Sequence, residues 1–143
     1  MLNFINLEVK ACELNNAENQ VHGFYICAIS DDNLEHRVIT GLSQDMDLSD
    51  NNPKFKQDIC ASYVTIDVNT LRRNTGLKDI TGRILYERDM LISDTGEFIR
   101  IEIKNDEPVL VFLAFDSCTS SNVQEIINDH KLQWISDPYT NIQ

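Results

Sequence analysis

The sequence predicts an α+β fold that is mostly antiparallel β-sheet. We expect an N-terminal α/β portion in residues 1–70 and a small β-barrel in residues 71–143, together forming one compact unit. Two observations predict this. Short segments that alternate apolar and polar residues recur along the chain, which is typical of half-buried strands. In the C-terminal half, turn-forming residues separate such segments at intervals of about 8–12 residues, the spacing of a small barrel.

The N-terminal portion contains four expected strands. Residues 5–11 alternate apolar and polar side chains, and residues 63–68 do the same. Residues 21–30 form a nearly unbroken apolar run, which predicts a strand covered on both faces. A turn then leads into residues 37–40 as its hairpin partner. Residues 43–58 are polar and lack a clean period, so we interpret them as a surface loop or a short helix.

The C-terminal portion is predicted to be strand-rich, with one helix. Residues 75–82 have turn chemistry, and Gly82 stands where a hairpin loop needs a positive φ. Ser121 with Gln124 three residues later resembles a capping box, which predicts a helix to about His130. We expect strands over residues 84–86, 89–92, 98–103, 109–115 and 132–135.

The composition restricts the classes of function. There are 12 Lys and Arg residues against 23 Asp and Glu, a net charge of −11, which does not suggest binding to nucleic acid or to an anionic membrane. The first dozen residues have no basic region before an apolar stretch, so we expect no signal peptide. The longest uncharged apolar run has seven residues, Val109–Phe115, far fewer than the ~20 that span a bilayer. We therefore expect a soluble, cytoplasmic protein.

No motif in the sequence predicts catalysis or metal binding. The cysteines form no C-x-x-C pair and have no histidine at zinc spacing, so we interpret them as buried structural thiols: Cys12, Cys27, Cys60 and Cys118. Glu87 and Asp89 lie two residues apart, but a general acid–base pair needs different environments and a pocket, which the sequence does not show. We expect a non-enzymatic protein without a cofactor or metal.

The segment Asn74–Met90 resembles the signature of the YopX family of phage and prophage proteins. Val21–Tyr25 and Val38–Thr40 are similar to upstream segments of that family. The resemblance implies an α+β fold with a small β-barrel, a phage or prophage origin, and no catalytic residues. Nine signature positions match in register: Thr75, Gly76, Leu77, Lys78, Asp79, Gly82, Tyr86, Glu87 and Asp89.

Four signature residues are expected to shape turns: Gly76, Gly82, Glu87 and Asp89. The segment from Tyr86 to Met90 looks like the sharp turn that opens an SH3-like barrel, in which a carboxylate accepts backbone N–H bonds. The family has glycine where this chain has Arg88. If that glycine serves a positive φ, either Arg88 is strained or the turn differs here.

The segment from Leu71 to Arg88 is the only clearly basic one. It carries five bases against the two acids Asp79 and Glu87, and it has no interleaved aromatic residues for stacking on nucleobases. One interpretation is a contact site for an anion or phosphate. The other is pairing with the acidic surface of this or a neighbouring subunit. The five bases are Arg72, Arg73, Lys78, Arg83 and Arg88.

We expect a phage- or prophage-encoded accessory factor that binds a host or phage protein in the bacterial cytoplasm. Two alternatives stay open: an acidic nucleic-acid mimic that inhibits a host DNA-binding protein, and a weak nucleic-acid-binding regulator that uses the basic segment. We also expect a homo-oligomer. Residues 21–29 and 109–115 lack the polar alternation of a strand with one wet face, and a 143-residue chain has few interior positions that cover both faces.

Overall fold

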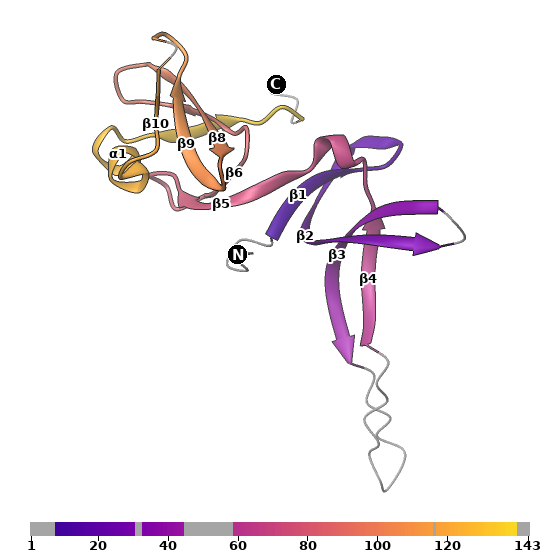
Figure 1. Cartoon of the computed structure of the whole chain (residues 1–143). Coiled ribbons are helices and arrows are strands. Elements are labelled where there is room, and N and C mark those ends of the chain that lie inside the picture. Colours follow the sequence, from indigo (N-terminus) through magenta and orange to yellow (C-terminus); the bar gives the residue numbers. More distant parts are fainter. Residues whose placement is uncertain (1–7, 31–32, 45–58, 116, 140–143) are drawn as a thin grey trace, which may run out of the picture.

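A computed structural model describes residues 8–30, 33–44, 59–115 and 117–139 of the chain (Figure 1). These residues contain one α-helix, α1 (Val123–Asp129), and a short 3-10 helix, η2 (Val68–Thr70). The strands are β1 (Glu8–Glu13), β2 (Asn16–Ser30), β3 (Asn33–Gln44), β4 (Ile59–Thr65), β5 (Arg72–Lys78), β6 (Ile84–Tyr86), β7 (Met90–Ile92), β8 (Phe98–Lys104), β9 (Glu107–Phe112), β10 (Ser117–Thr119) and β11 (Gln133–Ser136).

The fold is mostly antiparallel β, so the expected N-terminal α/β portion is wrong. Between residues 8 and 70, the described residues form four strands and η2, with no α-helix among them. The predicted loop or short helix over residues 43–58 lies outside the described residues, except for Ser43 and Gln44, which end β3. The alternation that favoured strands was the correct signal here, because these strands pair with one another and need no covering helix.

The first sheet has the strand order β4-β3-β2-β1-β5-β6, and it curls back on itself. The Leu14 N–H donates to Thr65 O at 2.9 Å and the Asp67 N–H to Cys12 O at 3.0 Å, so the end of β4 meets the end of β1. This curl encloses a small core. Its buried residues come from β1, from β3 and from the position directly after β4: Val9, Ala11, Val38 and Ile66.

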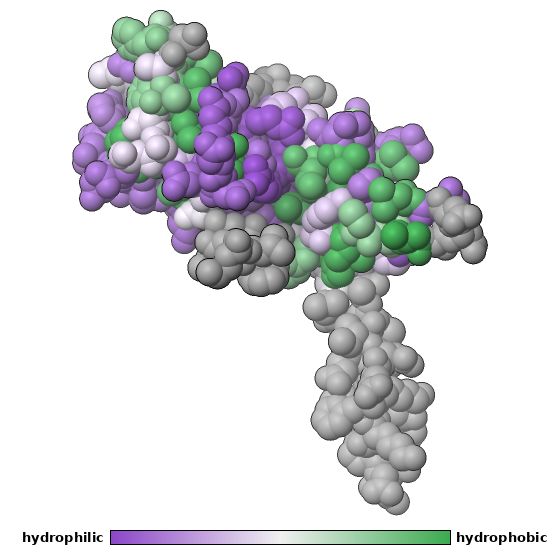
Figure 2. All heavy atoms as spheres, viewed as in Figure 1, coloured by the Kyte–Doolittle hydropathy of each residue, from purple (hydrophilic) through white to green (hydrophobic). Residues whose placement is uncertain are grey.

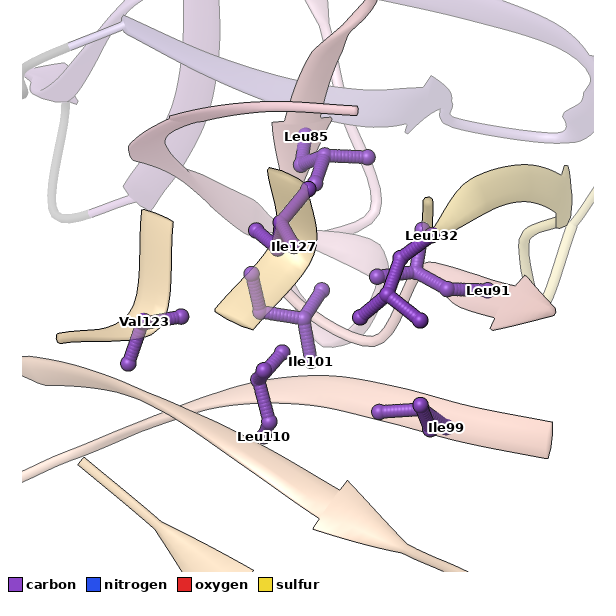
Figure 3. Close-up of a cluster of buried hydrophobic side chains, with 8 residues drawn as sticks. All are labelled: Leu85, Leu91, Ile99, Ile101, Leu110, Val123, Ile127 and Leu132. Carbon is purple, nitrogen blue, oxygen red and sulfur yellow. The ribbon is translucent and has the colours of Figure 1, made fainter. Parts of the chain in front are cut away.

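The second sheet has the order β10-β9-β8-β7-β11, with α1 packed against its core. This five-stranded antiparallel sheet forms the C-terminal lobe, and the expected SH3-like barrel stays a prediction. The buried side chains come from strands β6 to β9, from the apolar face of α1 and from the residue just before β11 (Figure 3). They are Leu85, Leu91, Ile99, Ile101, Leu110, Val123, Ile127 and Leu132.

Strand β5 joins the two lobes of the molecule. It runs from the lobe of β1–β4 to the lobe that contains α1 and β8–β10 (Figure 1). It pairs with β1 at one end and with β6 at the other. The first sheet therefore continues past residue 70, and the division into subdomains 1–70 and 71–143 stays a prediction.

Two local predictions fail because longer-range bonds compete with them. Residues 75–78 belong to β5 rather than to a turn, and the register of β5 against β6 is interrupted by a bulge between Asn74 and Lys78. The expected capping box is absent, since Asn122 precedes α1 in a left-handed conformation without a side-chain cap. Gln124 reaches the backbone of Lys78 instead, accepting its N–H at 3.1 Å and donating to its carbonyl at 2.9 Å.

Replacing Gly23 by alanine is expected to lower the free energy of unfolding by about 1–3 kcal/mol. A Cβ on Gly23 would lie 2.0 Å from the carbonyl oxygen of Ile39, so β2 and β3 would have to separate there. Gly41→Ala is the matched control, because a Cβ at that position meets no atom within 4 Å. Urea denaturation followed by circular dichroism measures both variants. Equal changes in the two variants would contradict the close approach at Gly23.

Candidate functional site

Arg72 lies inside the protein rather than on its surface. Its side chain is 1% exposed, and one guanidinium nitrogen, Nη1, is 2.7 Å from Asp89 Oδ1. The other, Nη2, donates to Gln20 Oε1 at 3.1 Å and lies 3.7 Å from Asp137 Oδ2. Arg72 thus connects β2, β5, the turn before β7 and the segment after β11, and it is not positioned to contact an external anion.

Asp89 holds both the buried arginine and the turn that precedes it. Its Oδ2 accepts the backbone N–H of Tyr86 at 2.8 Å, and its own N–H donates to Tyr86 O at 3.1 Å. Arg88 occupies the third position of this turn with φ 69°. Of the two alternatives for Arg88, the strained one therefore applies, because the conformation favours glycine and costs an L-residue roughly 1–2 kcal/mol.

Arg73 and Glu87 form a half-exposed ion pair beside the buried one. Glu87 Oε1 accepts both the backbone N–H and the Nε–H of Arg73, each at 3.0 Å. The hydrogen bond to Glu87 is the main cause that raises the pKa of Arg73. Asp106 adds a weaker contact at 3.4 Å. Pairing within the chain, the second interpretation of the basic segment, thus describes Arg72 and Arg73.

The other three bases do not converge on a common surface. Lys78 is exposed at the end of β5. The Arg83 guanidinium carbon lies 3.4 Å from the centre of the Trp134 ring, and that of Arg88 lies 5.4 Å from the Tyr139 ring. Arg83 and Arg88 thus each have an aromatic partner. These rings belong to the C-terminal part of the chain, so the sequence of the basic segment alone did not predict them.

The signature residue Asp79 anchors the loop between β5 and β6. Its Oδ1 accepts bonds from the backbone N–H groups of Thr81 and Arg83, both at 2.9 Å, and from the Thr81 hydroxyl at 2.6 Å. Its Oδ2 accepts the N–H of Trp134 in β11 at 2.9 Å. Burial raises the pKa of Asp79, but these hydrogen bonds outweigh it and hold the pKa below its ordinary value. Gly82 closes this loop with φ 91°.

Glu8 and Lys10 of β1 flank Tyr86 near the buried arginine. The Tyr86 hydroxyl donates to Glu8 Oε1 at 2.9 Å, and Lys10 Nζ lies 4.6 Å from the centre of the Tyr86 ring. Burial and then the hydrogen bond to Glu8 raise the pKa of Tyr86. Burial and the nearby Arg72 charge lower the pKa of Lys10. These contacts add to the internal polar network and offer no open binding site.

An exposed apolar surface lies on the outer face of β2, β3 and β4. Phe24 pairs with Ile39, and Ile39 pairs with Tyr63, so the three side chains lie next to one another on one face of the sheet. Phe24 is 52% exposed and Tyr63 is 50% exposed. We call Phe24, Ile39 and Tyr63 the outer row. Hydrophobic residues gather over this lobe in Figure 2, whereas hydrophilic ones cover the region between the lobes.

The prediction that β2 is covered on both faces is therefore wrong for the chain by itself. Phe24 and Ile26 are exposed on the outer face, and Ile29 is exposed on the other. The sequence shows the unusual apolar run of residues 21–30, but it does not predict which face of β2 is exposed to solvent. That depends on the register of β3, which the strand pattern does not set.

An apolar hollow opens on the other sheet, β10-β9-β8-β7-β11. It has a volume of about 640 Å³ and is lined by residues of β7, β8 and β11 and of the two turns beside them, among them Met90, Phe98, Leu113 and Ile135. The sequence predicts a strand over residues 109–115, but β9 ends at Phe112, and Leu113 just after it is 41% exposed. The hollow carries one charged side chain, Glu97.

The interpretation of the cysteines as buried thiols holds for Cys12 and is wrong for Cys27 and Cys118, which are exposed. The side chain of Cys60 lies outside the described residues. Cys27 is exposed because β1 pairs with β2 only as far as Phe24 in the described part of the chain, so the end of the β2–β3 hairpin extends past the small core.

Comparison with protein-family models, with curated proteins and with solved structures finds no match for this chain. Within the described ranges, no group of three or more His, Cys, Asp or Glu side chains is placed to hold a metal ion. Those ranges also contain no helix with the length and apolar character needed to cross a membrane.

Replacing Arg72 by methionine is expected to lower the free energy of unfolding by about 3–5 kcal/mol, because it leaves the Asp89 carboxylate buried without its cation. Arg73→Met is the matched control. Its ion pair is partly exposed, so its loss is expected to cost about 1 kcal/mol or less. Urea denaturation provides both values. Similar losses in the two variants would show that the Arg72 contacts do not hold the lobes together.

Replacing Asp79 by asparagine is expected to cost about 1–3 kcal/mol at pH 7, because an amide group cannot accept every N–H that the carboxylate accepts. The folded-state pKa of Asp79 is lowered, so its contribution is present above the ordinary carboxyl pKa of about 3.9 and is lost as the pH falls through the lower, folded value. The difference between wild type and variant should therefore shrink in acid.

Urea denaturation followed by the fluorescence of Trp134, the single tryptophan, tests this prediction across pH. Asp94→Asn is the control, since Asp94 is exposed and its carboxylate has no hydrogen bond among the described residues. A difference that stays constant from pH 7 to acid would contradict the role of the Asp79 charge.

Proposed function

We propose that this chain is a non-enzymatic protein-binding factor that docks through the outer row, with a second copy of itself as the first partner. The observation that carries the proposal is the exposed pair of aromatic side chains, Phe24 and Tyr63, on either side of Ile39. Half-exposed aromatic residues side by side on a sheet face are costly in water and favour burial by a protein surface.

The surroundings of the outer row match the anatomy of a protein interface. Arg37 lies on the same face, with its guanidinium carbon 4.2 Å from the centre of the Tyr63 ring, and it is paired with Glu35. Aromatic residues and arginine are enriched at the centres of such interfaces, while charged pairs form the rim. The outer row with Arg37 therefore has the composition of a docking centre.

A second copy is the simplest partner because a bare sheet face can pack on an identical one. Two such faces related by a twofold axis bring the same residues together and close the assembly. A chain with a net charge of −11 repels its own copies, so the contact must be apolar to overcome that repulsion. The outer row meets this condition.

The proposal of a phage or prophage origin, with action on a host or phage protein in the bacterial cytoplasm, comes from the YopX-like signature. No described contact favours the two nucleic-acid alternatives. Asp79 and Asp89 are buried, and several other acids are paired with arginines, so these carboxylates do not form a phosphate-like array: Glu35, Glu87 and Glu102. Both alternatives stay predictions.

Sedimentation equilibrium at micromolar concentration and physiological salt tests self-association. We expect a mass near twice the 16.4 kDa of the chain for the wild type and near 16.4 kDa for Phe24→Ser. Phe98→Ser is the matched control, because Phe98 is 51% exposed, like Phe24, but lies on the other sheet. A wild-type mass near 16.4 kDa at every concentration would exclude self-association. A Phe24→Ser dimer would show that the outer row is not the interface.

A further inference from the structure

Three side chains on the face of the β2–β3 hairpin opposite the outer row form a cluster, which we call the thiol cluster: Tyr25, Cys27 and His36. Cys27 and His36 are directly opposite one another in the register of the two strands. Cys27 Sγ lies 3.6 Å from His36 Nδ1. The Tyr25 hydroxyl lies between them, 2.7 Å from the sulfur and 2.6 Å from the same ring nitrogen.

The cluster has the parts that activate a thiol. A thiolate is the reactive form of cysteine, and at pH 7 only about 3% of an ordinary thiol is ionised, so a base within hydrogen-bond reach speeds attack. His36 is that base, acting directly or through the Tyr25 hydroxyl. The rings of Tyr25 and His36 are stacked, with their centres 5.8 Å apart, which holds the imidazole in place.

Tyr25 remains protonated near neutral pH and therefore passes a proton on rather than keeping the charge. The hydrogen bond to Cys27 and, after it, burial raise the pKa of Tyr25 to about 12. The two contacts allow the thiol to donate to the tyrosine oxygen while the tyrosine hydroxyl donates to His36 Nδ1. When the proton moves along this path, the products are a thiolate and an imidazolium.

The thiol is also accessible to a reagent. Cys27 is exposed, and the next pair on this face, Ile29 and Leu34, is 81% and 59% exposed. Cys12 of β1, by contrast, is buried. A small molecule can therefore approach the sulfur from solvent.

We propose that Cys27 is a thiol–disulfide exchange site that takes small disulfides of the glutathione type. The Cys27 sulfur attacks one sulfur of the disulfide, a new S–S bond forms to Cys27, and the original S–S bond breaks. The leaving thiolate takes up the proton that His36 accepted from Cys27. The small disulfide is the oxidant, so no other reagent is needed. This inference does not depend on the proposed docking function.

Reaction of the native full-length chain with oxidised glutathione tests the proposal, with mass spectrometry of each cysteine peptide. Cys118 is an internal control, because it is exposed like Cys27 but has no histidine partner among the described residues. We expect Cys27 to react about tenfold faster than Cys118 in the wild type. Equal or slower reaction of Cys27 would overturn the proposal.

Two variants test the base and the path of the proton. In His36→Gln, and to a smaller extent in Tyr25→Phe, the rate at Cys27 should fall toward the rate at Cys118. Tyr25→Phe keeps the ring and removes only the hydroxyl that contacts both partners. A purely structural effect would instead raise the rate at the buried Cys12. An unchanged rate at Cys27 in both variants would overturn the role of the cluster.

Discussion

The structure depends on one buried cation. Arg72 is fully enclosed, and a buried charge is tolerated only when opposite charges and hydrogen-bond acceptors surround it. Asp89 supplies the opposite charge at Nη1, while Gln20 and Asp137 lie at Nη2. These residues come from β2, from the turn before β7 and from the segment after β11. Pairing the buried charge of Arg72 therefore requires both lobes and the C-terminal segment to meet at β5.

The residues that resemble the YopX signature serve this meeting point. Asp89 accepts the Tyr86 N–H and so closes the turn, and Glu87 pairs with Arg73. Asp79 connects the loop between β5 and β6 to β11. Each carboxylate accepts at least one backbone N–H group, from a turn or from a neighbouring strand. The basic and acidic residues of this segment are thus mainly used inside the molecule. The segment that resembles the signature is therefore largely structural, and other surfaces of the molecule are the candidates for binding.

The two surfaces proposed for contact with other molecules both lie on the β2–β3–β4 lobe. The outer row is on one face of this sheet, and the thiol cluster is on the other, near the end of the β2–β3 hairpin. Docking on the outer row and modification of Cys27 would therefore use opposite faces of one hairpin. A disulfide partner on Cys27 leaves the outer row free, and the two properties can be measured separately.

The sequence by itself determined most of the strands and several turns. The alternation in β1 and the Asn105–Asp106 turn between β8 and β9 are local features, set by side chains one or two positions apart. Only the tertiary structure decided that Phe24 is bare and Arg72 enclosed. The partner of a buried charge and the cover of a sheet face come from residues distant along the chain. Strand register and the meeting of the lobes bring them together, and local periodicity does not specify either.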